Sequence, residues 1–147
     1  MFDTFEKNNE MDSITIFLKH THSGLRWMVL AILLYAIVNA LVNLKKGDFS
    51  AKDKLVNILT LSFVHLQVVI GLILYFTEGR FKGFSNMSDA TSRLYALEHP
   101  LTMILGAILI TVGHVKVKKA TKSKRKYRLT ALYFGLGLLL ILSRIPW

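Results

Sequence analysis

Four long apolar runs, separated by polar stretches, dominate the pattern of this chain. They cover about 22–44, 55–76, 95–116 and 129–145. A helix needs about 20 apolar residues to cross the hydrocarbon core of a bilayer. The pattern therefore predicts an all-α, polytopic membrane protein, with residues 13–147 forming a single up-down bundle of four transmembrane helices. Residues 1–12 are polar and are expected to form an N-terminal tail.

Charge in the polar stretches predicts the orientation of the spans. Basic residues concentrate in segments 45–54 and 116–128, and the second segment holds eight of them without an acidic residue. Cytoplasmic loops of membrane proteins carry an excess of Lys and Arg. This rule places both segments in the cytoplasm and both termini outside, on the periplasmic side of a bacterial inner membrane. The net charge of +10 is thus a topology signal, and no nucleic-acid partner is expected.

Composition narrows the chemistry further. The chain has 147 residues, 52% of them hydrophobic, and no cysteine. The missing thiols exclude disulfides, thiolate nucleophiles, iron–sulfur ligation and covalent c-type haem attachment. Histidine is then the main side chain that can bind a redox metal.

The third apolar run has a histidine near each end. His99 and His114 are fifteen residues apart, so on a helix they differ by about 60° in direction and lie roughly 22 Å apart. Gly106 and Gly113 lie within about 40° of the direction of His99. A face of this kind admits a large flat group beside the backbone, and haem is such a group.

Histidines on the other spans suggest how a haem is held. In an up-down bundle the first and third helices are diagonal, so His22 and His99 at similar depth can meet across the core. That is the arrangement of a bis-histidine haem. His65 and His114 differ in depth by about one turn and form a second, inner candidate pair. All four are candidate iron ligands, with arginines as partners for haem propionates: Arg26 and Arg144.

The second span carries two polar stripes. One contains His65, and the other contains Thr60, Gln67 and Gly71 on the nearly opposite side. Both stripes cannot face one narrow interior. This favours either a homo-oligomer or a larger membrane complex in which the helix is covered on two sides.

Four segments carry a family resemblance: HSGLRWMVL from His22, HLQVVIGLILYF from His65, EHPLTMIL from Glu98, and the terminal IPW. In these the chain resembles small four-helix bacterial membrane proteins labelled cytochrome b-like. It is more loosely similar to cytochrome b561-type bundles and to the halves of haem A synthase. The resemblance implies outer haem ligands at His22 and His99, with His65 and His114 as inner candidates.

The expected function is electron transfer by one or two b-type haems, exchanging electrons with a quinone or a redox partner protein. Such a cytochrome is not an enzyme with its own substrate. One alternative is a cofactor-free accessory subunit of a larger inner-membrane complex. The other is a small transporter or quinone-binding protein with a protonatable His65 at mid-membrane.

Overall fold

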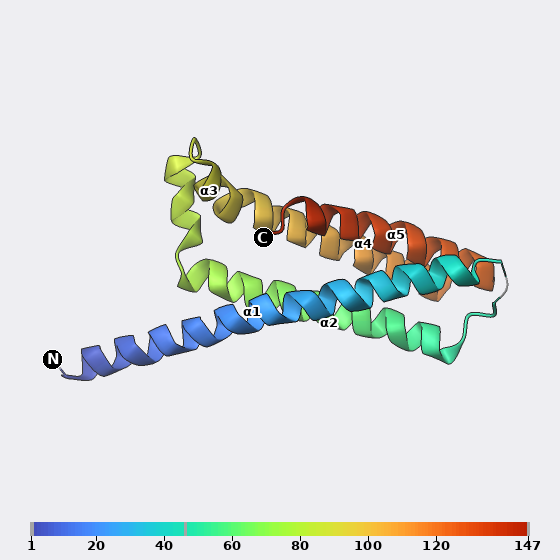
Figure 1. Cartoon of the computed structure of the whole chain (residues 1–147), viewed down its shortest axis with the longest axis horizontal. Coiled ribbons are helices and arrows are strands. Elements are labelled where there is room, and N and C mark those ends of the chain that lie inside the picture. Colours follow the sequence, from blue (N-terminus) through green and yellow to red (C-terminus); the bar gives the residue numbers. More distant parts are fainter. Residues whose placement is uncertain (1, 46, 147) are drawn as a thin grey trace.

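The computed structural model describes residues 2–45 and 47–146, with side chains described from Asp12 onward. Every regular element in those residues is a helix, and Figure 1 shows an elongated bundle. Three short elements lie between α2 and α4: the 3₁₀-helix η1 (Arg80–Asn86), α3 (Ala90–Arg93) and the π-helical turn η2 (Leu94–Glu98). The long helices are α1 (Phe2–Asn43), α2 (Ala51–Thr77), α4 (His99–Lys119) and α5 (Ser123–Ser143).

Four segments are long and apolar enough to cross a membrane, which confirms the predicted number of spans. Their helices extend beyond the predicted ranges. α5 begins at Ser123 inside the basic segment, and α1 begins at Phe2, within the stretch predicted as a tail. The predicted ranges follow hydrocarbon thickness alone, whereas backbone hydrogen bonding continues a helix into the headgroup region. The four segments are Asp12–Asn43, Ala51–Thr77, Ala90–Lys119 and Ser123–Ser143.

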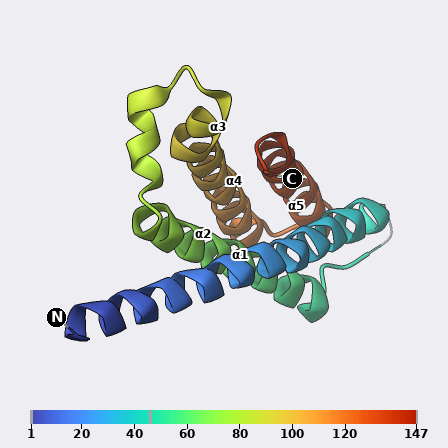
Figure 2. The same cartoon turned by 60° about the vertical axis from the view of Figure 1, so that its left-hand side comes forward.

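The long helices form a closed ring of contacts. α1 packs against α2 and α5, and α4 packs against the same two helices. α1 and α4 therefore occupy diagonal corners, as predicted for the first and third spans. Residues 44, 45, 47–50 and 120–122 lie at one end of the bundle, here called the basic end (Figures 1 and 2). Segment 78–93 and the C-terminus lie at the other, here called the loop end.

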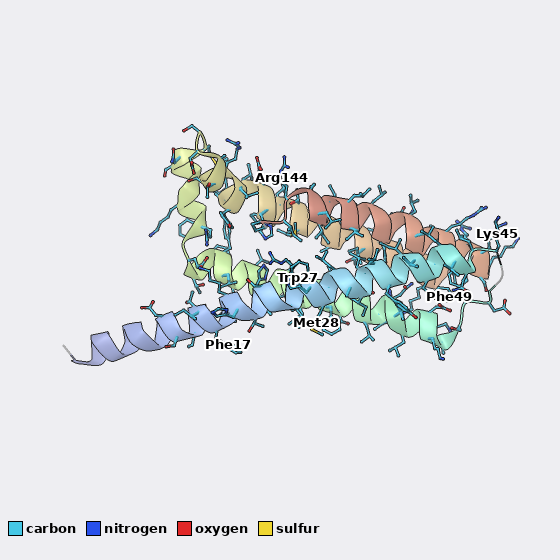
Figure 3. The ribbon with its side chains drawn as sticks, in the orientation of Figure 1. Phe17, Trp27, Met28, Lys45, Phe49 and Arg144 are labelled. Carbon is cyan, nitrogen blue, oxygen red and sulfur yellow. The ribbon has the colours of Figure 1, made fainter. Side chains whose placement is uncertain are left out.

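Large apolar side chains cover the outside of the bundle as well as its core. Phe17, Trp27 and Met28 are 68%, 58% and 55% exposed, and Figure 3 shows Phe17 and Met28 pointing away from the bundle. In the centre, Leu33 and Phe134 are fully buried. A chain that is apolar on both its inner and outer faces is suited to contact with lipid, which is as apolar as the core.

Glycines set the close packing of α4 on α5. A Cβ at Gly106 would lie 3.1 Å from Ile141 Cγ1, and one at Gly113 would collide with the Cβ of Tyr133. Both glycines are buried against α5. The sequence predicted that they leave room for a haem; the structure uses that room for the neighbouring helix, as small residues do in many transmembrane pairs.

Proline distorts the third span where it enters the bundle. Pro100 lacks the N–H that an α-helix would use to bond the carbonyl of Ala96. That carbonyl instead accepts a hydrogen bond from the Tyr75 hydroxyl of α2 at 3.0 Å. The preceding turn is π-helical, with the N–H of His99 bonded to the carbonyl of Leu94. The distortion thus lies immediately before His99. The hydrogen bond from Tyr75 links this turn to α2.

The basic end holds a buried polar cluster. The Asp53 carboxylate accepts hydrogen bonds from Asn39 Nδ2 at 2.6 Å and from the Tyr127 hydroxyl at 3.0 Å. It also accepts from the backbone N–H and the hydroxyl of Ser50, both at 2.7 Å. Asp53 is 8% exposed. One carboxylate therefore joins α1, α2 and α5 at the end opposite the histidine pair described below.

We expect Asp53→Asn to lower the free energy of unfolding by about 2 kcal/mol, because the amide places a donor against groups that need an acceptor. Asp48→Asn is the control, since Asp48 is exposed and only its backbone carbonyl accepts from Tyr127. Denaturant titration of the detergent-solubilised protein, followed by circular dichroism, measures both. Equal stability of the two variants would contradict a stabilising role for this cluster.

Candidate functional site

Two histidines from diagonal helices meet at the loop end. His22 lies in α1, and His99 is the first residue of α4. Their ring centroids are 6.4 Å apart, and the ring planes are nearly perpendicular at 88°. The sequence predicted this encounter from depth and helix order alone, and the structure brings the two side chains together.

The His99 ring is held in one tautomer. Its Nδ1 lies 2.9 Å from the backbone carbonyl oxygen of Arg144 at the end of α5. A carbonyl only accepts, so Nδ1 carries the proton and Nε2 is left with a free lone pair. Metal-ligating histidines are oriented in this way, by donating their other ring N–H to a carbonyl or carboxylate.

The His22 ring is held by α2. Gln67 Nε2 donates to the backbone carbonyl of His22 at 2.9 Å, and a Cβ at Gly71 would lie 2.9 Å from the His22 Cε1. A larger residue at this position would make the ring shift. Three buried polar atoms here lack a hydrogen-bond partner within the described part of the chain: His22 Nδ1, Arg26 Nε and Gln67 Oε1.

Both histidines line a cavity of about 360 Å³ between the two helix pairs. Its wall combines apolar residues of all four spans with a few polar and charged side chains. The volume lies within the usual range of small-molecule sites, about 300–1,000 Å³. The polar and aromatic residues of the wall include Lys19, His22, Arg26, Gln67, Tyr75, Glu78, Arg80, Tyr95 and His99.

Charged side chains surround the loop end of this cavity. Arg26 donates through a terminal guanidinium nitrogen to the Pro146 carbonyl at 2.8 Å, which joins α1 to the C-terminal segment. Burial would raise the pKa of Glu78, but hydrogen bonds from Lys19 and Arg80 outweigh it and hold that pKa below its usual value. Glu78 is therefore ionised at neutral pH and paired with both cations.

Arg144 acts on the site through its backbone. Its side chain pairs with Glu98, with Nε 3.0 Å from Oε2, and is not part of the cavity wall. Figure 3 places it at the loop end of α5. The side chain of Arg144, predicted to bind a haem propionate, is thus paired with Glu98. The backbone carbonyl of Arg144 orients His99.

The inner histidines do not form a comparable pair. His65 is exposed, with Nδ1 2.7 Å from the Leu61 carbonyl and Nε2 3.3 Å from the Thr111 hydroxyl of α4. His114 is half-buried, and its Nδ1 has no partner among the described residues. Neither histidine lines the cavity, and neither do Gly106 and Gly113. The structure therefore supplies one histidine pair.

Several cavity residues were not predicted from the sequence. Gln67 and Gly71 were recognised as a stripe, but the sequence did not show that this stripe faces inward and His65 outward. Lys19, Glu78 and Arg80 flank the ends of spans, where charged residues are ordinary. Only their mutual contacts distinguish them, and these depend on how the helices are rotated.

No group of three or more His, Asp or Glu side chains suited to a metal ion occurs in residues 12–45 and 47–146, a stretch without cysteine. A metal held by protein ligands alone is therefore not indicated, whereas a haem iron needs only two. The fold is all-helical, and its four long apolar helices are consistent with a multi-pass membrane protein. No protein-family model, curated protein or solved structure matches the chain.

Proposed function

We propose that this protein binds one b-type haem between His22 and His99 and transfers electrons within a membrane. The observation that carries the proposal is the 6.4 Å separation of the two imidazole centroids. Two imidazoles on opposite sides of one metal ion have centroids about 6 Å apart, given metal–nitrogen bonds of about 2.0 Å and the size of the ring. The pair thus has the spacing that axial ligation requires.

Two further features support a haem at this position. The tautomer of His99 leaves Nε2 available as a ligand. The buried Arg26 Nε has no partner in the described structure and is a donor suited to a propionate carboxylate. When bound, the haem would supply one-electron redox chemistry. The chain would supply the imidazoles, a countercharge and an apolar wall that excludes water.

A single haem is proposed rather than two. His65 bonds to Leu61 and Thr111, and Ala36 and Ala40 on α1 are buried within the bundle. A second haem between His65 and His114 would need space that packed side chains occupy. The haem would then serve one side of the membrane rather than form a relay across it.

We propose that the loop end faces the periplasm of a bacterial cell. Lys45 (Figure 3) and the lysines in the last turn of α4, Lys116, Lys118 and Lys119, lie at the basic end, which the positive-inside rule assigns to the cytoplasm. The bundle would then have both termini outside. Electrons would be exchanged at the periplasmic surface, with a quinone in the outer leaflet or with a redox partner protein.

The deciding experiment is a reduced-minus-oxidised spectrum of the protein purified in detergent from haem-replete cells, with pyridine haemochrome quantification. We expect a b-type spectrum and a ratio of about one haem per chain, because one ligand pair is present. A colourless protein would overturn the proposal and favour a cofactor-free accessory subunit, which affinity purification with its membrane partners would then reveal. A ratio of two would restore the inner site.

A further inference from the structure

A second cavity lies next to the histidine cavity at the loop end. Its volume is about 590 Å³, and its wall is largely polar. Three residues, Glu78, Arg80 and Tyr95, line both cavities, so their side chains form the partition between them. The remaining wall comes from the loop-end parts of α1, α2, η1 and the third span: Asp12, Thr15, Thr77, Gly79, Gly83, Thr91 and Ser92.

The partition is made of charge contacts between separate segments. Glu78 Oε1 lies 2.9 Å from Lys19 Nζ of α1, and its Oε2 lies 2.7 Å from an Arg80 guanidinium nitrogen. The guanidinium of Arg80 in turn lies over the Tyr95 ring of η2, 4.3 Å from its centroid. This chain of contacts runs from α1 through the end of α2 to the third span, across the loop end of the histidine cavity.

These contacts are weak enough to open. The Lys19 and Arg80 side chains are 59% and 33% exposed, and an ion pair at such a position contributes little net stability. Gly79, between Glu78 and Arg80, has φ of +63°, a backbone conformation that glycine adopts without strain. A residue with wide backbone freedom thus lies directly between the two members of the ion pair.

We propose that Lys19, Glu78, Arg80 and Tyr95 form a gate that controls the passage of small water-soluble molecules from the polar cavity to the histidine pair. Glu78 holds the gate closed, because its carboxylate pairs with both Lys19 and Arg80. We call this carboxylate the latch. Loss of the Glu78 carboxylate would release Lys19 and leave Arg80 with its contact over the Tyr95 ring, so that the two cavities can join. The gate is formed by residues other than the two histidines, so its test is read separately from the haem spectrum.

The chain has no cysteine, so an introduced thiol reports access cleanly. Met103 lines the histidine cavity and not the polar one, and Met103→Cys places the thiol behind the gate. We would measure its rate of modification in intact membranes by a cationic and an anionic methanethiosulfonate, with and without Glu78→Gln. Both rates are expected to rise about tenfold, since the variant removes two ion pairs.

Two controls make the result decisive. Ser85→Cys is exposed outside the gate, and its rate should not change with Glu78→Gln; unchanged reactivity there also shows that the loop end is intact. Arg93→Gln breaks the neighbouring ion pair between Arg93 and Glu98. Neither residue lines either cavity, so this variant should leave the modification rate of Met103→Cys unaltered. Unchanged rates with both reagents in Glu78→Gln would overturn the gate. Rates that change in opposite directions would also overturn it, because they would report only a change of local charge.

Discussion

His22→Ala is expected to remove the b-type spectrum from the purified protein. His22 is one of only two imidazoles that line the cavity, and its partner His99 lies 6.4 Å away. In the proposed site this variant would leave the haem held by His99 alone, and we expect haem per chain to fall at least about tenfold, since even removing a hydrogen bond to a metal ligand lowers metal affinity by about 10- to 100-fold. His99→Ala should behave alike, because the two act as a pair.

His65→Ala is the matched control for this experiment. It removes an imidazole of the same kind from a helix position that does not reach the cavity. The spectrum and the haem ratio should remain those of the unmodified protein. If His22→Ala keeps full absorbance, ligation by this pair is wrong. If His65→Ala instead halves the haem ratio, a second site is present.

Gly113→Ala is expected to lower the free energy of unfolding by about 2 kcal/mol, the usual cost of overpacking a close interface. The added methyl would meet the Cβ of Tyr133, which lies next to the α5 backbone and cannot swing away. α4 and α5 would have to move apart where Gly106 and Gly113 contact α5. Denaturant titration of the detergent-solubilised variant measures the change.

Gly135→Ala is expected to raise the free energy of unfolding, the opposite of the effect expected for Gly113→Ala. A Cβ at Gly135 would meet no heavy atom within 4 Å, although the residue lies in the same helix pair. Removing a glycine from the interior of a helix without a clash should stabilise the protein by about 0.5 kcal/mol.

If Gly113→Ala is as stable as the unmodified protein but loses haem, the prediction for Gly113 is wrong. The glycine then makes room for a cofactor and not for α5.

Helix number and helix order were predictable from the sequence, and the histidine pairing followed from them. A run of about 20 apolar residues has one way to satisfy its backbone in lipid, which is to form a helix. Four such runs in an up-down arrangement bring the first and third to diagonal corners. His22 and His99 then share a depth, because each lies close to the outer end of its predicted apolar run.

Helix rotation was not predictable in the same way. In water, an apolar stripe marks the buried face of a helix, but lipid removes that contrast because outward faces are equally apolar. The two stripes of α2 could therefore not be ranked. Packing decided between them: Thr60 is fully buried and Gln67 bonds to α1, while His65 is exposed.

The sequence by itself thus determined four helical spans, their order and the depth of each ionisable side chain, because these depend on hydropathy and rise per residue. Only the tertiary structure decided what each side chain meets. It placed Gly106 and Gly113 against α5, and it brought Glu78 and Arg80 to the wall of the histidine cavity. Those outcomes depend on interlocking side chains far apart in the chain, where a rotation of one helix replaces every neighbour at once.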